Sequence, residues 1–160
     1  MGRFSVALLL LVGATISSQA DAADRLPQDY VVKEGSGLTY LTLGMTSDEA
    51  LHNLGEPDQN LYGFIFVNKQ PDGTMLSYRI ADDHVAAINL KGNAKSKYIT
   101  MKGAKLGMSR NQVILLYGAP DAAAVNKVFY HALGISFFFN NDLLYEVSIV
   151  PPRKTGLINH

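Results

Sequence analysis

The sequence repeats one motif at a fixed spacing, and this repeat limits what the chain can fold into more than any other feature. Residues 43–46 (Leu-Gly-Met-Thr) return as residues 106–109 (Leu-Gly-Met-Ser), and residues 54–58 (Leu-Gly-Glu-Pro-Asp) return as residues 117–121 (Tyr-Gly-Ala-Pro-Asp). Both matches have an offset of 63 residues, since 106 − 43 and 117 − 54 are equal. Two separated blocks in one register indicate that one structural unit is written twice.

Each copy encodes a short helix together with both of its ends. Thr46 with Glu49, and Ser109 with Gln112, have the spacing of a capping box, in which a hydroxyl and a carboxyl or amide group satisfy the backbone donors of the first turn. Each second block supplies a glycine and then a proline, which is the pattern of a helix C-terminus. We therefore predict a helix of two to three turns after Thr46 and another after Ser109.

Alternating apolar residues after each helix predict β-strands. The expected strands cover residues 61–67, 74–80 and 85–90 in the first copy and residues 127–132, 135–139 and 143–150 in the second. The predicted fold class is α+β: two tandem repeats, each a short capped helix followed by a three-stranded antiparallel meander packed on it. Because one short helix covers such a sheet only partly, the two copies are expected to lie side by side or to join as one sheet.

The N-terminus has the pattern of a signal peptide. Arg3 precedes an apolar run over residues 6–12, which is too short to span a bilayer, and cleavage is expected after Ala20 or Ala22. An uncleaved anchor is the alternative. We therefore predict an exported protein, periplasmic or secreted. The predicted organisation is a signal peptide (1–22), repeat 1 (23–95), repeat 2 (96–150) and a flexible tail (151–160).

Composition excludes several classes of function. The chain has no cysteine, which excludes a disulfide framework, thiolate metal sites and a lipid-modified N-terminal cysteine. Its 14 basic and 14 acidic side chains balance, so it lacks the positive field that nucleic acid requires. We expect no nucleic-acid partner, no membrane span and no lipid anchor. Residues 91–105, which connect the repeats, contain five lysines; we interpret them as a solvated linker, with contact to a lipid headgroup or a polyanion as the alternative.

The sequence shows no pattern typical of an enzyme. It contains no Gly-x-Ser-x-Gly elbow, phosphate loop or dinucleotide fingerprint. Asp58 and Asp121 recur after the prolines and fit Pro-Asp turns better than an acid/base pair. We therefore predict no catalytic residues, no cofactor and no metal. Four histidines lack the paired spacing of metal ligands: His52, His84, His131 and His160.

One face of the second meander is the candidate site. A two-residue turn at residues 133–134 would place Tyr130 opposite Phe137, which makes one face a continuous apolar core. The core face is then Val128, Tyr130, Ile135, Phe137, Phe139, Tyr145, Val147 and Ile149. The other face would carry aromatic side chains flanked by polar ones, as protein interfaces do. The alternative is that this face packs on the first repeat or on residues 24–37. The candidate protein-binding residues are Phe129, His131, Phe138, Leu144 and Glu146.

The two repeated blocks, each followed by a meander, resemble the SmpA/OmlA (BamE) family and its tandem-repeat relatives with the β-lactamase inhibitor protein (BLIP-like) fold. The resemblance covers residues 38–150 as two repeats. It implies a small α/β module that binds other proteins in the bacterial envelope, to help outer-membrane protein assembly or, in tandem members, to inhibit a hydrolase. The chain departs from the assembly factors in lacking their lipidated cysteine, which argues against outer-membrane anchoring.

The function predicted on these grounds is a periplasmic or secreted protein-binding module, such as an outer-membrane or envelope assembly accessory. Its expected partner is an envelope or secreted protein, and the oligomeric state is left open. The first alternative is a secreted inhibitor of a hydrolase such as a β-lactamase or a cell-wall enzyme. An unrecognised enzyme is the less favoured alternative.

Overall fold

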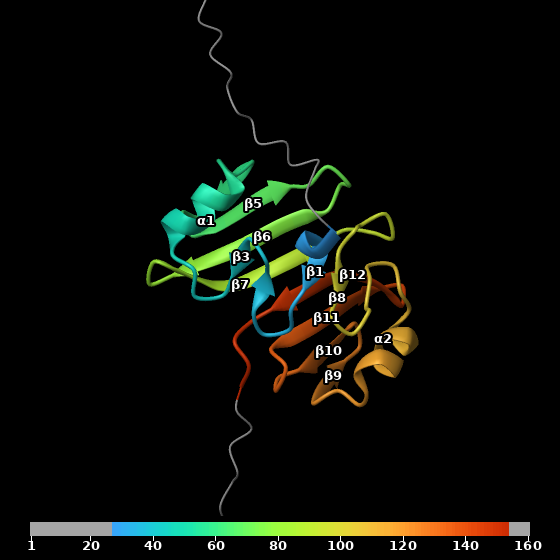
Figure 1. Cartoon of the computed structure of the whole chain (residues 1–160). Helices are drawn as coiled ribbons and strands as arrows, with labels where there is room; N and C mark the ends of the chain where they lie inside the picture. Colours follow the sequence, from blue (N-terminus) through green and yellow to red (C-terminus); the bar gives the residue numbers. More distant parts are fainter. Residues whose placement is uncertain (1–26, 154–160) are drawn as a thin grey trace, which may run out of the picture.

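Eight antiparallel strands form one continuous sheet in the computed structural model, which describes residues 27–153 (Figure 1). The strand order is β4-β5-β6-β7-β12-β11-β10-β9. The bounds are β4 Gln59–Leu61, β5 Ile65–Lys69, β6 Met75–Ala81, β7 His84–Lys91, β9 Ala122–Ala124, β10 Lys127–Tyr130, β11 Ile135–Asn140 and β12 Leu143–Ile149.

The remaining elements cover one face of this sheet (Figure 1). Helices α1 (Ser47–Leu54) and α2 (Arg110–Tyr117) lie over opposite halves of it. Between them a short 3-10 helix leads into two small pairings, parallel β1·β8 and antiparallel β2·β3. The bounds are Pro27–Tyr30 for the 3-10 helix, β1 Val31–Val32, β2 Gly37–Leu38, β3 Leu41–Thr42 and β8 Ile99–Thr100.

The predicted fold class is therefore wrong. Each helix is followed by four strands of the sheet rather than three, and the described chain is mostly β with two eight-residue helices. The two halves join as one sheet, which is one of the two arrangements expected. One helix also does not cover one meander, since only Ala50 of α1 is buried. Apolar residues of β1, β2, β3 and the connector after β7 complete the core instead.

Two strands were overlooked for local reasons. The predicted strand over residues 61–67 contains the turn between β4 and β5, so it merges the end of one strand with the next. β9 consists of three exposed alanines, which show no apolar alternation and have low strand propensity. Both are edge strands, held by pairing with their neighbours rather than by burial of their side chains.

Both repeated blocks adopt the same local structure. The predicted capping boxes are confirmed, because Thr46 and Ser109 are extended N-caps that accept from the third helical amide and receive the reciprocal bond. Each block is also tied to the last hairpin of its own half. The Gly44 amide donates to the Val85 carbonyl at 2.8 Å, and the Gly107 amide donates to the Leu144 carbonyl at 2.7 Å.

The hairpins held by these blocks also match. The turn residues Asp82 and Asp83 have φ values of 50° and 62°, and Asn141 and Asp142 have 48° and 65°, as type I′ turns require. A register shift follows in each hairpin, between Arg79 and Ile80 and between Phe138 and Phe139. β7 and β12 then pair antiparallel at the centre of the sheet, where Asn89 faces Ser148. The two halves thus meet through their last strands.

The connector is part of the fold rather than only a linker. Its lysines at positions 95, 97, 102 and 105 are exposed, as a solvated linker predicts, but Tyr98, Thr100 and Ala104 are buried. β8 within it pairs with β1, which brings the N-terminal segment against the core. The prediction of a solvated linker therefore holds for its charged side chains alone.

Some predictions fall outside the described residues. The signal peptide (1–22) does, and so does the predicted tail beyond Arg153. The boundary predicted between residues 95 and 96 lies in the connector and stays a prediction. No helix within residues 27–153 has the length and apolar character needed to cross a membrane.

Candidate protein-binding face

The sheet face opposite the helices, which we call the open face, is built by alternate residues of every strand. Strand pairing aligns them in two rows that cross the sheet. One row is mainly small and polar, and the other combines charged and apolar side chains. The first row runs Ser77, Asn89, Ser148, Ser136 and Phe129. The second runs Met75, Lys91, Glu146, Phe138 and Lys127.

A hollow of about 240 Å³ lies on this face, over β10, β11 and the end of β12. We call it the aromatic groove. The His131 ring stacks on the Phe129 ring, with centroids 5.5 Å apart and an interplanar angle of 17°. Lys127 Nζ lies 5.5 Å from the centroid of Phe129. The aromatic groove is lined by Phe129, His131, Ser136, Phe138, Ser148, Val150, Pro151 and Arg153.

Four of the five predicted site residues lie together on the open face. Phe129, His131, Phe138 and Glu146 are half-buried there, and Phe138 faces Glu146 across β11 and β12. The predicted core face is confirmed at seven of its eight positions, since only Tyr145 is half-buried rather than buried.

Leu144 was assigned to the wrong face. It is 1% exposed and belongs to the core cluster. The cause is the bulge in β12: Phe138 pairs with Glu146 and Phe139 with Leu144, so Tyr145 is an extra residue. An inserted residue reverses the alternation beyond it, and residue patterns alone do not reveal where a strand bulges.

The predicted turn between β10 and β11 was also too short. Tyr130 pairs with Ile135 and Val128 with Phe137, so residues 131–134 form a four-residue loop. The shift relative to the predicted pairing is two residues, which leaves every side chain on its predicted face.

The alternative packing of this face is not found among the described residues. The first half of the chain extends the same sheet instead of covering it. Val32 of the N-terminal segment lies beside Leu90 and Val147, on the helix side of the sheet. The described part of residues 24–37 therefore leaves Phe129 and Phe138 uncovered.

The charges of the strands are concentrated on the open face. Lys69, Arg79, Lys91 and Lys127 are the basic residues of the eight strands, and Glu146 is their one acid. Burial raises the pKa of Glu146, and the nearby Lys91 ammonium opposes this shift. The open face is therefore positive in a chain with no formal net charge.

Sequence reasoning overlooked part of the groove. Pro151 and Arg153 form its rim, although residues 151–160 were assigned to a tail. The Arg153 amide donates to the His131 carbonyl at 2.9 Å, which holds the chain at the groove after β12 ends. No local pattern predicts this contact, because it joins residues far apart in the sequence.

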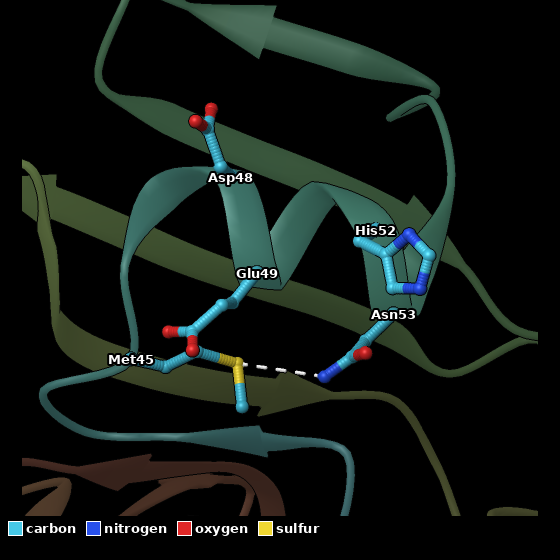
Figure 2. Close-up of a pocket in the computed structure, with 5 residues that line it drawn as sticks. All are labelled: Met45, Asp48, Glu49, His52 and Asn53. Carbon is cyan, nitrogen blue, oxygen red and sulfur yellow. Dashed lines mark hydrogen bonds between the residues drawn. The ribbon is translucent and has the colours of Figure 1, made fainter.

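A second hollow, of about 390 Å³, lies against α1 and is lined by Met45, Asp48, Glu49, His52 and Asn53 (Figure 2). Backbone and side-chain hydrogen bonds from Thr46 lower the pKa of Glu49, so this carboxylate serves the helix cap. Asn53 Nδ2 donates to Met45 Sδ at 3.7 Å, and Asp48 points away from both (Figure 2).

His84 bonds the Asp82 carbonyl of its own turn, at 2.6 Å. Within residues 27–153, no three histidine, aspartate or glutamate side chains form a group that could hold a metal ion. In the aromatic groove, the stacked rings of Phe129 and His131 lie near the cationic side chains of Lys127 and Arg153. Comparisons of the chain with family models, curated proteins and solved structures find no match.

Proposed function

We propose that the chain is a periplasmic or secreted protein-binding module that holds its partner on the open face of the sheet. The observation that carries the proposal is the pair Phe129 and Phe138, half-buried in the lining of the aromatic groove on a face that no other described layer covers. Aromatic side chains in partly enclosed sites, surrounded by polar groups, supply most of the binding energy of protein interfaces.

The sheet supports this role mechanically. Phe129 and Phe138 stand on strands paired on both sides, β10 between β9 and β11 and β11 between β10 and β12. Side chains held on such a framework lose little further freedom on binding, which lowers the entropic cost of association. The stacked His131 ring restricts Phe129 further.

Charge indicates the kind of partner. The strands carry four cations and one partly buried carboxylate on the open face, so an acidic protein surface is favoured over a basic one. The resemblance to SmpA/OmlA proteins adds support for binding within the envelope, as an assembly accessory. The absent cysteine argues for a partner, rather than a lipid, as the means of retention there.

Inhibition of a hydrolase is a second candidate, favoured by the tip of the β4–β5 hairpin. Tyr62 is 85% exposed, and its ring stacks on the exposed Phe64 with centroids 6.0 Å apart. Tyr62 has a φ of 59°, which is unfavourable for an aromatic residue and is typical of functional loops. A projecting aromatic tip fits a concave site such as an enzyme cleft.

Affinity capture tests the first candidate. The mature protein is immobilised and exposed to envelope extract, alongside Phe129→Ala and Phe138→Ala, with Val125→Ala as a control at an exposed apolar residue outside the groove. We expect both phenylalanine variants to lose the captured protein at least tenfold, as hot-spot losses of about 2 kcal/mol imply. Their melting temperatures should stay near that of the parent. Equal capture by all variants would contradict the proposal.

An inhibition assay tests the second candidate. β-Lactamases and cell-wall hydrolases are assayed with the parent protein and with Tyr62→Ala. Inhibition that is lost in Tyr62→Ala and kept in Phe138→Ala would select the hairpin tip over the open face. No inhibition by the parent would remove this candidate.

A further inference from the structure

The two helices occupy equivalent places in the repeat but present different surfaces to solvent. With the 63-residue offset, His52 and Asn53 of α1 correspond to Leu115 and Leu116 of α2. Leu115 is 85% exposed and Leu116 is 39% exposed. Since α1 forms the same capped helix with polar residues at these positions, the fold does not require leucines there. Contiguous exposed apolar side chains, unlike scattered ones, are typical of interaction surfaces.

A third exposed apolar side chain lies in the turn after β8. Met101, 65% exposed, follows β8, and its amide donates to the Val32 carbonyl at 3.0 Å. A β-carbon placed on Gly103 would lie 3.9 Å from Leu116 Cδ2, and Lys102 Nζ lies 5.1 Å from the ring centroid of Tyr117. The turn at residues 101–103 therefore lies against the C-terminal end of α2.

Unbalanced positive charge borders these side chains. Residues 84–120 contain six lysines and arginines and no aspartate or glutamate. Lys102 and Lys105 are exposed, whereas Arg110 is engaged by the carbonyls of Ala124, Val125 and Lys127. Glu34, the acidic residue that follows β1, accepts a hydrogen bond from the Tyr117 hydroxyl. Lys102 and Lys105 thus have no acid from their own segment to pair with.

We propose that Met101, Leu115 and Leu116, together with Lys102 and Lys105, form a second protein-binding surface, which we call the α2 patch. Its partner is a protein that presents an apolar surface bordered by carboxylates. The α2 patch belongs to the helix side of the sheet, opposite the open face, so both surfaces can be occupied at once (Figure 1). The inference thus goes beyond the proposed function: the chain joins two proteins.

The size of the apolar centre favours a protein over a bilayer. Two leucines and one methionine offer less apolar surface than a single myristoyl chain, which by itself gives only marginal membrane binding. Met and other adaptable apolar side chains are enriched at protein interfaces, where a rim of charged groups adds specificity. The exposed lysines supply that rim here.

Site-specific photo-crosslinking tests the α2 patch in the full chain. A benzophenone amino acid replaces Leu115 in one variant and His52, its counterpart on α1, in the matched control, and both are irradiated in the cells that make the protein. We expect an adduct with another protein that is at least tenfold stronger at position 115. Its linked peptide should contain Asp or Glu. Adding Lys102→Glu and Lys105→Glu should weaken the adduct at least tenfold. Each reversal is expected to lose about 1 kcal/mol of binding free energy, which is about fivefold, and the two losses multiply.

Two further measurements separate this proposal from its competitors. Phe138→Ala should leave the adduct unchanged, which distinguishes the α2 patch from the open face. A double variant, Leu115→His with Leu116→Asn, gives α2 the residues that α1 has at these positions. It should abolish capture of the crosslinked protein. Its melting temperature should stay within about 3 °C of the parent, as expected for changes at the surface. The proposal is overturned by equal adducts at positions 115 and 52, by adducts with lipid or a second copy, by insensitivity to charge reversal, or by a large loss of stability in the swap.

Discussion

Leu143 and Leu144 are neighbours in β12 with opposite environments, and replacing each by alanine tests the register on which the open face depends. Leu144 is 1% exposed and Leu143 is 51% exposed. A buried leucine replaced by alanine loses its transfer free energy and leaves a cavity, which costs about 2.7–5 kcal/mol. Leu144 lies next to a turn, where neighbours relax more easily than in mid-strand, so we expect about 3 kcal/mol. Leu143→Ala should cost less than about 0.5 kcal/mol.

Urea unfolding followed by circular dichroism measures both values. If the surface exposed on unfolding is unchanged, the slope of the free energy against urea should match the parent, and only the midpoint should move. In thermal unfolding, Leu144→Ala should lower the melting temperature by about 10 °C, given the size of the described domain. Phe138→Ala, on the open face, should stay near the parent, as Leu143→Ala does.

The opposite ranking would refute the reasoning. If Leu143→Ala costs as much as Leu144→Ala or more, then Tyr145 is not the extra residue and the alternation of β12 continues unbroken. Leu144 would then lie on the open face together with Glu146, and Leu143 and Tyr145 would point to the core.

Three other changes test contacts that hold distant segments together. Tyr117→Phe removes the hydroxyl that donates to Glu34, and should cost about 1.5 kcal/mol in urea at pH 7, whereas an unchanged midpoint would show that water replaces the bond. Burial alone would raise the pKa of Asp72, but hydrogen bonds from the Lys97 amide and from Thr74 outweigh it and hold the pKa below 3.8. Because the folded pKa is the lower one, this contribution to stability is present above pH 3.8 and lost as pH falls through the folded pKa. Asp72→Asn should therefore cost about 1 kcal/mol at pH 7 and little in acid, and a pH-independent cost would contradict the assignment. Burial raises the pKa of Glu146 against the pull of Lys91, so the sign reverses: stability falls as pH rises above 4.5 through the folded pKa. Glu146→Gln should then flatten this fall in melts recorded from pH 4 to 8.

The parts of the fold that were predicted correctly are written within a few residues of one another. A capping box needs only a hydroxyl and a carboxyl or amide three residues apart, so Thr46 and Ser109 identify both helices without reference to the rest of the chain. The core face of the second half follows from simple alternation over short strands.

The parts that were missed depend on pairing between distant segments. How the two halves join was left open between packing side by side and forming one sheet, because it depends on β7 pairing with β12, a contact between residues 88–91 and 146–149. β9 has no signal of its own and exists because β10 offers an edge. The bulge at Tyr145 changes the site by one residue, and with it the environment of Leu144. Such errors are expected wherever tertiary structure decides between patterns of equal local quality.

Differences between the halves are more informative about function than the features they share. The shared residues, caps, turns and buried apolar positions, are those that the frame requires. At the 59-residue offset that aligns the bulged hairpins, Arg79 corresponds to Phe138 and Ala87 to Glu146. The first half shows that a polar or small residue at these positions satisfies the fold. The stability of the fold therefore does not explain why the second half has an aromatic residue, Phe138, and a partly buried acid, Glu146. The same reasoning applies to Leu115, whose counterpart is His52. Both surfaces proposed for binding lie where the second half departs from the first, which places recognition mainly in that half and the architecture in both.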